Sequence, residues 1–269
     1  AMPYDSAEED AHGTAVAGVI AAAENGTGIA GVAPGIKLVP LKFMKGSMGY
    51  TSDAVEAMAY ARKMGVDVAV CGFGCNDYNP ALEEAMEGSE VLYVCAAGND
   101  GSGGLYWPGS IELPNVISVA SIDRSGSLAA TSNYGDRTDL AAPGEEILTT
   151  VPGGYGYMSG TSMSAAFVAG VAALAKSSRP ESTVVDIARS IRGGVVAMES
   201  LKGKVETGGR VDAYRALTAL DWILDGYPAV EASASPAPGS GRMTVQATEP
   251  LVYPDLVDML HFGEEGVNP

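Results

Sequence analysis

The chain has 269 residues, of which 46% are hydrophobic and 18% charged, so it can bury a large core and is not a disordered chain. Its formal net charge of −17 argues against nucleic acid as a partner, because a phosphate backbone is bound mainly through clustered Lys and Arg. No stretch reaches the roughly 18–20 apolar residues that cross a bilayer, and the sequence carries no signal peptide pattern, so no transmembrane segment is expected.

The first half of the chain alternates strand and helix patterns. We expect a strand over residues 36–43, and then a helix over 53–64 that Thr51 or Ser52 caps. Pro80 opens a second, short helix that ends at residue 86. Further apolar runs predict strands over 66–71, 90–97 and 115–120. Strands that alternate with helices predict a parallel sheet covered on both faces.

The second half continues the pattern and then changes composition. A strand is expected over 147–151 and a long apolar helix from near Ser162. One further helix is expected to start at 180–182, and another to span 210–220. The core fold is expected to end near Trp222. From Tyr227 to Pro250 the sequence is rich in Ala, Ser, Pro and Gly, and residues 235–241 are typical of a linker or an exposed excursion. We therefore predict a main domain over 1–222 and a C-terminal extension over 223–269.

Three short motifs carry the side chains suited to chemistry. His12 opens the run HGTAVAG, Ser162 lies in GTSMSAA, and Asn99 ends AAGN between them. Alone, the serine would more often be a helix N-cap, the histidine a helix-start residue and the asparagine a turn residue. Their occurrence together favours a catalytic set over these structural interpretations.

The chemistry follows from the residue types. A serine hydroxyl is a poor nucleophile at neutral pH, so Ser162 needs a base, and His12 is one of only two histidines in the chain. His12 would accept the serine proton and return it to the leaving amine. The backbone N–H of Ser162 at a helix start and the side-chain amide of Asn99 would then hold the oxyanion.

In this order the three motifs resemble the histidine, oxyanion-asparagine and serine motifs of subtilisin-like serine peptidases (subtilases, peptidase family S8). Segments 28–34, 132–135, 139–144 and 209–213 extend the resemblance over about residues 9 to 220. It implies a three-layer α/β fold with a mostly parallel central sheet flanked by helices. It also implies a secreted serine endopeptidase, processed from a zymogen, that acts on peptides or proteins, with residues 1–222 as its catalytic domain.

The resemblance assigns a groove in which an extended peptide lies between two strand-like edges. Small residues in the pocket for the residue before the scissile bond predict an open, apolar space and a preference for large apolar side chains. For the second edge a simple strand-end turn is the alternative interpretation. One edge comprises Gly46, Ser47 and Met48, the other comprises Gly72, Phe73 and Gly74, and the pocket is lined by Ala96, Ala97 and Gly98.

The family's catalytic aspartate ends a buried strand in an Asp-Thr/Ser-Gly setting, and no such strand precedes His12. Asp5 has no buried strand before it, and Asp10 is too close to turn back onto the histidine ring. Asp255 and Asp258 are conceivable, but nothing in their spacing demands the role. We therefore expect the first strand and its aspartate to be missing from this chain and supplied by a separate segment.

Three explanations for the missing aspartate remain open at this point. In the first, the chain is the larger product of a cleavage and has an N-terminal fragment or a propeptide as its partner. In the second, it is a fragment of a longer enzyme. In the third, it is a pseudoenzyme. The alternative function is accordingly a peptide-binding or scaffolding module without catalysis. Without its aspartate the histidine loses the partner that fixes its tautomer, so the isolated chain should be nearly inactive.

Few residues of the sequence suit a cofactor or a disulfide. Calcium is implied only by the resemblance, because the loop at 24–27 lacks the several carboxylates of a strong site. Cys71, Cys75 and Cys95 are too few for a disulfide framework, and no nearby histidine or second cysteine pair completes a zinc site. Buried strand thiols are the simpler interpretation, and no metal ligand is assigned.

Overall fold

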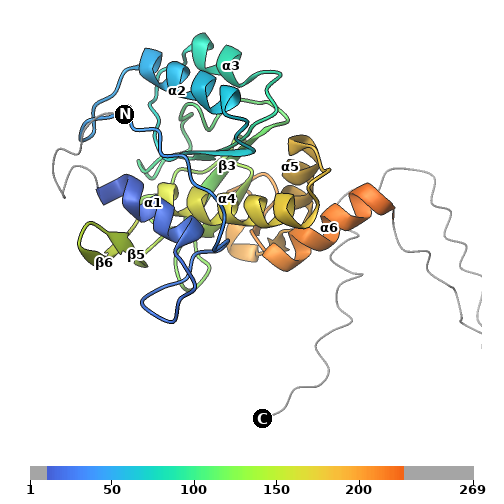
Figure 1. Ribbon diagram of the computed structural model, residues 1–269. Helices are drawn as coiled ribbons and strands as arrows, with labels where there is room; N and C mark the ends of the chain where they lie inside the picture. The colour runs from blue at the N-terminus through green and yellow to red at the C-terminus, as the bar shows by residue number, and fades with distance from the viewer. Residues whose placement is uncertain (1–10, 227–269) are drawn as a thin grey trace, which may run out of the picture.

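The computed structural model describes residues 11–226, and in it a six-stranded sheet lies between two layers of helices (Figure 1). The strand order is β1-β2-β3-β4-β8-β7; the pairs from β1 to β8 are parallel and β7 pairs antiparallel with β8. The expected α/β fold with a mostly parallel sheet is confirmed. The strands are β1 (Val68–Cys71), β2 (Leu92–Ala96), β3 (Val116–Ile122), β4 (Leu140–Pro143), β7 (Val196–Ala197) and β8 (Gly209–Arg210).

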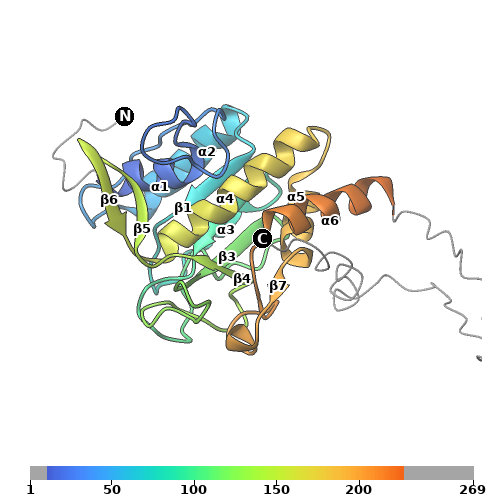
Figure 2. The ribbon, with the colours of Figure 1, turned by 90° about the horizontal axis from the view of Figure 1, so that it is seen from below.

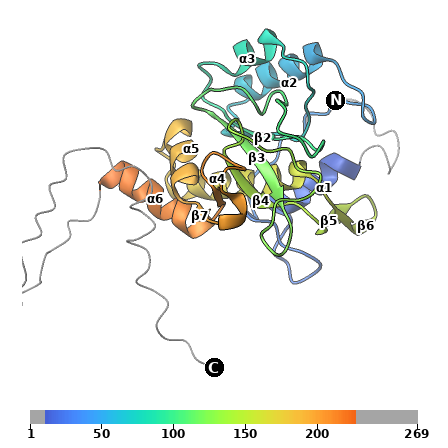
Figure 3. The same cartoon turned by 180° about the vertical axis from the view of Figure 1, so that it is seen from behind.

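Two helices cover one face of the sheet and four cover the other (Figure 3). The separate hairpin of β5 (Ile147–Val151) and β6 (Gly154–Met158) packs beside the first helix. On one face lie α2 (Thr51–Lys63) and α3 (Pro80–Met86); on the other lie α1 (Ala11–Ala21), α4 (Thr161–Ser178), α5 (Val184–Gly193) and α6 (Ala213–Asp225). A short 3-10 turn, η1, spans Glu199–Leu201.

Alternation along the strands divides the core between the two faces. Leu92 and Val94 of β2 belong to the cluster around α1, α4, α5 and α6, while Tyr93 and Cys95 belong to the cluster under α2 and α3. Helix α4 runs across one face of the sheet, in front of the strands in Figure 2, and is buried on nearly every side. Its run of alanines combines high helix propensity with the small volume that close packing on a sheet requires.

Local signals explain several helix starts. Asn79 accepts a hydrogen bond from the amide of Ala81 (3.0 Å) ahead of Pro80, as an N-cap does. Thr183 and Asp186 form a capping box, so α5 begins at Val184 and not at 180–182. The expected cap of α2 is wrong, because the helix already begins at Thr51 and follows Tyr50 without a capping side chain.

The strand expected over residues 36–43 is absent. This segment lies between the turn at 34–35 and the short bridge of Lys45 with Met48, and it joins no sheet among the described residues. Leu38, Val39 and Leu41 are exposed by 46%, 43% and 36%. The segment has the apolar residues typical of a strand, but no strand among the described residues lies beside it to form hydrogen bonds with it.

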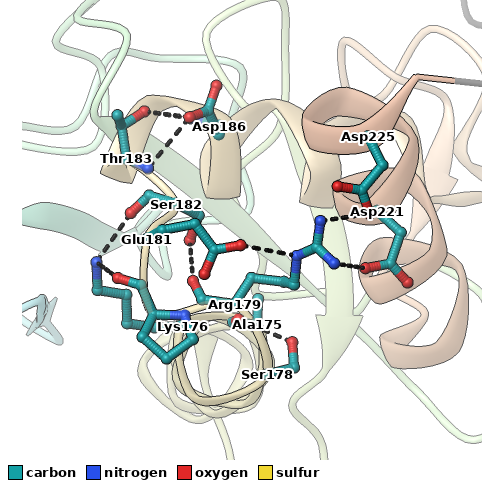
Figure 4. Close-up of polar contacts among 11 residues, drawn as sticks. Ala175, Lys176, Ser178, Arg179, Glu181, Ser182, Thr183, Asp186, Asp221 and Asp225 are labelled. Carbon is teal, nitrogen blue, oxygen red and sulfur yellow. Dashed lines mark hydrogen bonds and ion pairs between the residues drawn. The ribbon is translucent and has the colours of Figure 1, made fainter.

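An ion cluster fastens α6 beside the end of α4 (Figure 4). Arg179 follows α4 and pairs with Glu181 (3.1 Å), with Asp221 (3.4 Å) and with Asp225, the last two from one face of α6. The hydrogen bond with Asp225 is the main cause that raises the pKa of Arg179, although burial opposes it. The C-terminal extension expected after 222 lies largely outside the described residues, because only α6 continues into it, as far as Asp225.

Two of the three free thiols lie in the sheet. Cys71 and Cys95 are buried partners in the register of β1 with β2, and hydrogen bonding with Cys71, together with burial, raises the pKa of Cys95 well above its usual range. Cys75 is exposed, so the interpretation as a buried thiol is wrong for it. Within residues 11–226 no helix has the length and apolar character needed to span a bilayer.

Candidate active site

Helix α1 places His12 in its first turn. Hairpin strand β5 holds this helix, since the Thr149 hydroxyl donates to the Ala15 carbonyl (2.7 Å) and the Thr150 hydroxyl to the Thr14 carbonyl (2.8 Å). Both bonds lie within one turn of the histidine. The position of the ring therefore depends on how the hairpin packs against α1.

Helix α4 places Ser162 in its first turn. Gly160 precedes the helix with a φ of 139°, a conformation that residues with a Cβ rarely adopt. The side-chain oxygen of Asn99 accepts from the backbone N–H (2.9 Å) and the hydroxyl (3.1 Å) of Thr161. Asn99 thus acts as a cap for the helix start, and Ser162 follows directly with 8% of its surface exposed.

Gly72, directly after β1, lies against both His12 and Ser162. A Cβ atom at Gly72 would stand 3.1 Å from Cε1 of the histidine and 3.4 Å from the serine oxygen. The serine hydroxyl donates to the Gly72 carbonyl at 2.9 Å. The fold therefore brings the predicted catalytic residues His12, Asn99 and Ser162 to the carboxyl ends of β1 and β2. This is the edge at which parallel sheets bind ligands.

Two N–H donors are available beside the serine. The side-chain oxygen of Asn99 accepts both hydrogen bonds from Thr161. The amino group of the same Asn99 side chain therefore points away from Thr161 and is left to donate elsewhere. The Ser162 N–H belongs to the first helical turn, whose N–H groups have no intrahelical acceptor. Asn133 supports this loop, because its side-chain oxygen accepts from the amides of Asp100 (2.9 Å) and Ser102 (3.2 Å).

The electrostatics of His12 favour its neutral form. Its side chain reaches solvent at the helix start, yet the protein packed around the ring desolvates it, and this burial lowers its pKa below the ordinary 6.5. Burial is the one cause of the shift among the described residues, so no carboxylate there opposes it. Asp5, Asp10, Asp255 and Asp258 lie outside the described residues.

The two predicted peptide-binding edges lie close to one another. Phe43, just before the edge at 46–48, packs edge-to-face on Phe73 of the other edge, with ring centroids 4.8 Å apart. The edge at 72–74 continues into Cys75, whose N–H and carbonyl pair with the carbonyl and N–H of Trp107 (2.9 and 2.8 Å). The backbone of Cys75 is therefore already paired on one side.

The predicted pocket is not open. Ala96 and Ala97 are buried, and the ring of Tyr106 lies directly against the backbone of Gly98 and of Gly74. The expectation of an open apolar space is therefore wrong, because it rests only on the small residues of the pocket walls. Nothing in the sequence near Tyr106 indicates that its side chain turns inward.

Sequence reasoning also misses two supporting residues. Thr161 links the start of α4 to residues 98–99, since its hydroxyl donates to Asn99 and accepts from the Gly98 N–H (3.2 Å). Asn133 lies in the segment 132–135, which the sequence singles out only through the family resemblance. Both are polar residues within motifs, but their partners lie 31 to 63 positions away in the chain, so no local pattern could identify them.

The loop at 24–27 contains a local turn. The side-chain oxygen of Asn25 closes a local turn by accepting from the amide of Thr27 (3.0 Å). In the part of the chain that the structure describes, no group of three His, Cys, Asp or Glu side chains could hold a metal ion. Calcium stays a prediction that rests on the family alone.

Known proteins share sequence with most of this chain. A model of the subtilase family matches residues 1–198. The chain is 38% identical over 223 residues to a thermophilic serine proteinase of Bacillus sp. (strain AK1), covering 80% of this chain and 54% of that protein. It is 42% identical over 175 residues to an intracellular serine protease of Paenibacillus polymyxa, covering 61% and 53%. The chain thus spans about half the length of these two relatives.

Other matches cover a larger share of the related protein. Subtilisin Savinase of Lederbergia lenta is 34% identical over 206 residues, which are 74% of this chain and 76% of Savinase. The solved structure of a protease from Pseudoalteromonas arctica PAMC 21717 superposes with a TM-score of 0.72 at 33% identity, covering 78% of this chain and 70% of that one. The structure of the prenylagaramide maturation protease PagA gives 0.68 at 27%, covering 78% and 82%.

Proposed function

Because this chain belongs to the subtilase family, we propose that it is the main part of a serine endopeptidase that hydrolyses peptide bonds. Ser162 attacks the carbonyl, His12 carries its proton to the leaving amine, and the Ser162 N–H with the Asn99 side chain holds the oxyanion. The observation that supports this most is Gly72, which lies against both His12 and the Ser162 hydroxyl.

In the present geometry the Ser162 hydroxyl donates to the Gly72 carbonyl. Attack requires that this proton be directed to His12 instead, and in a Ser-His-Asp triad the carboxylate holds the imidazole in the tautomer and orientation that accept it. This requirement favours a triad completed by an aspartate that the described residues do not supply. The alternative, a peptide-binding pseudoenzyme, corresponds to the geometry as it stands.

We propose that the aspartate arrives on an extended segment that adds to the free edge of β1. Within residues 11–226, strand β1 ends the sheet, and its first three residues are only half-buried. The exposed side chains of Leu38, Val39 and Leu41 offer the apolar surface that such a strand would cover. A hollow of about 380 Å³ between α1 and Leu38 and Pro40 adds to it.

A serine-directed probe tests the proposed chemistry. A fluorophosphonate should label the complete native protein at Ser162 and should not label Ser162→Ala. Ser159→Ala serves as a matched control, because Ser159 is exposed three residues earlier and should leave labelling intact. Failure of the complete protein to react would establish the pseudoenzyme instead.

The source of the aspartate is tested by intact mass and denaturing gels of the natively purified protein. A separate polypeptide that copurifies, or a longer single chain, should carry an apolar strand ending in Asp-Thr/Ser-Gly. Native protein that lacks this sequence would contradict the docking proposal.

Location is a separate matter. The relatives include proteins whose names call them intracellular, such as the major intracellular serine protease of Bacillus subtilis (strain 168). Family membership therefore does not fix the compartment, and secretion stays a prediction. Fractionation of the source culture, with detection of the chain in medium or cells, decides it.

A further inference from the structure

The ring of Tyr106 stands between the two glycines that border the predicted pocket. A Cβ atom at Gly98 would lie 2.8 Å from its Cγ and 3.0 Å from its Cδ2. A Cβ atom at Gly74 would lie 2.8 Å from its Cδ1 and clash with its Cε1. Opposite edges of the ring therefore face opposite walls, and both walls must be glycine for the ring to fit.

The backbone holds Tyr106 in this place. Its N–H donates to the Ser110 hydroxyl and its carbonyl accepts from the Ser110 N–H, each at 2.9 Å. The next residue, Trp107, is paired through both backbone groups with Cys75, at the end of the wall that contains Gly74. A main-chain shift that moved the Tyr106 ring out of this place would break the hydrogen bonds to Ser110 and those between Trp107 and Cys75.

The ring also remains neutral and only partly accessible. Burial is the main cause that raises the pKa of Tyr106, and the charges of Asp100 and Cys75 add to the shift. The phenol therefore stays protonated at neutral pH. What it presents toward the groove is an uncharged aromatic surface in place of a deep cavity.

We propose that Tyr106 closes the pocket for the residue before the scissile bond, so that the groove accepts glycine, alanine or serine there and rejects large apolar side chains. This inference rests on the proposed function and specifies its substrate class. A methyl or hydroxymethyl group fits against the face of the ring, whereas a leucine or phenylalanine side chain would need the space that the ring fills. Even a single methylene changes discrimination about 10- to 200-fold in such pockets.

Cleavage measures this selectivity directly. The complete native protein should hydrolyse short peptide p-nitroanilides ending in alanine at least about tenfold better in kcat/KM than those ending in phenylalanine. Tyr106→Gly should reverse that ratio, and Tyr106→Phe should keep it, since the ring alone fills the space. Leu105→Gly is the matched control, because Leu105 is the exposed neighbour and its loss should leave the ratio unchanged. A ratio near one, or an unchanged ratio in an active Tyr106→Gly protein, would overturn the inference.

Binding tests the same pocket without chemistry. In the complete protein carrying Ser162→Ala, calorimetry should detect a product peptide ending in alanine and find at least about tenfold weaker binding of one ending in phenylalanine. Equal affinity, or no binding of either peptide, would overturn the inference. Labelling of the unsubstituted protein by the fluorophosphonate reports the proposed function separately, so a failure of one is distinguishable from a failure of the other.

Discussion

Asn99 joins two tasks in one side chain, since its oxygen fastens the start of α4 and its amino group is left to donate. We expect Asn99→Ala to lower kcat about 10²–10³-fold with little change in KM, which is the loss known for removal of such a donor in a subtilisin. The loss of the acceptor for Thr161 should also lower the free energy of unfolding by about 1 kcal/mol.

Steady-state kinetics and denaturation of the same Asn99 variants separate these tasks. Asn99→Asp keeps the acceptor for Thr161 and removes the donor, so it should lose rate while keeping most of the stability. A kcat within about threefold of the parent in Asn99→Ala would exclude the oxyanion role.

His12 should titrate below 6.5 in the 269-residue chain, because burial lowers its pKa. Neutral histidine is then the form that folding favours, so its contribution to stability is present above 6.5 and is lost as the pH falls through the folded-state pKa. In the complete protein a docked carboxylate should raise the same pKa.

NMR titration of the His12 ring proton measures both values, and His261→Gln removes the signal of the second histidine. A pKa at or above 6.5 in the 269-residue chain would contradict the desolvation argument. Equal pKa values in the two proteins would contradict docking of a carboxylate.

At the scale of single residues, the sequence predicts where reactive side chains occur but not what surrounds them. His12, Asn99 and Ser162 lie in motifs defined by their immediate neighbours. The position of Tyr106 depends on pairing between segments about 30 residues apart, such as that of Cys75 with Trp107. A pocket built from small residues is therefore predicted as open whenever the side chain that fills it comes from elsewhere.

Helix α1 carries the histidine and packs tightly on β5 at Gly18. A Cβ atom there would lie 2.6 Å from the Thr149 hydroxyl and 2.8 Å from the Thr150 N–H, with the Thr150 hydroxyl closer still. We expect Gly18→Val to reduce the free energy of unfolding by about 1–3 kcal/mol through overpacking and to shift His12 away from Ser162.

Chemical denaturation measures the first effect and fluorophosphonate labelling the second. Gly13→Ala is the control in the same helix, since no atom lies within 4 Å of its Cβ position. It should be neutral or add about 0.5–1 kcal/mol, as alanine does in helices. Equal stability of the two variants would show that α1 can move off the hairpin freely.

Elements with local start signals are those that the sequence predicts most accurately. The helix at Pro80–Met86 agrees with its prediction, because Asn79 and Pro80 specify its start within three residues. The prediction of a strand over 36–43 is wrong because a β-strand forms only when it pairs with another strand. The apolar pattern of this segment gives no information on whether such a neighbouring strand is present. The hairpin strand β6 is missed for a related reason, since Gly154 and Gly156 alternate with Tyr155 and Tyr157 and give no apolar alternation.

For the whole molecule, the docking proposal predicts that the complete protein is more stable than the 269-residue chain. Burial of the apolar side chains of 36–43 worth about 2 kcal/mol would raise the midpoint of thermal unfolding by about 4–8 °C in a domain of this size. Hydrogen exchange should show protected amides in β1 in the complete protein and faster exchange in the shorter chain.

The same comparison with Ser162→Ala in both proteins removes any effect of self-cleavage. Identical unfolding midpoints and identical exchange at Val68–Cys71 would mean that nothing covers this edge.

Helix α4 contacts β1, β2, β3 and β4 on one side and α1, α5 and α6 on the other, and it carries Ser162 at its start. The residues that build the core and the residue proposed to react are therefore parts of one packed body. Sequence drift in that body is constrained twice, once by packing and once by chemistry. Divergence of substrate preference is free to occur at Tyr106 and in the segment at 43–50, which can change while His12, Asn99 and Ser162 stay as they are.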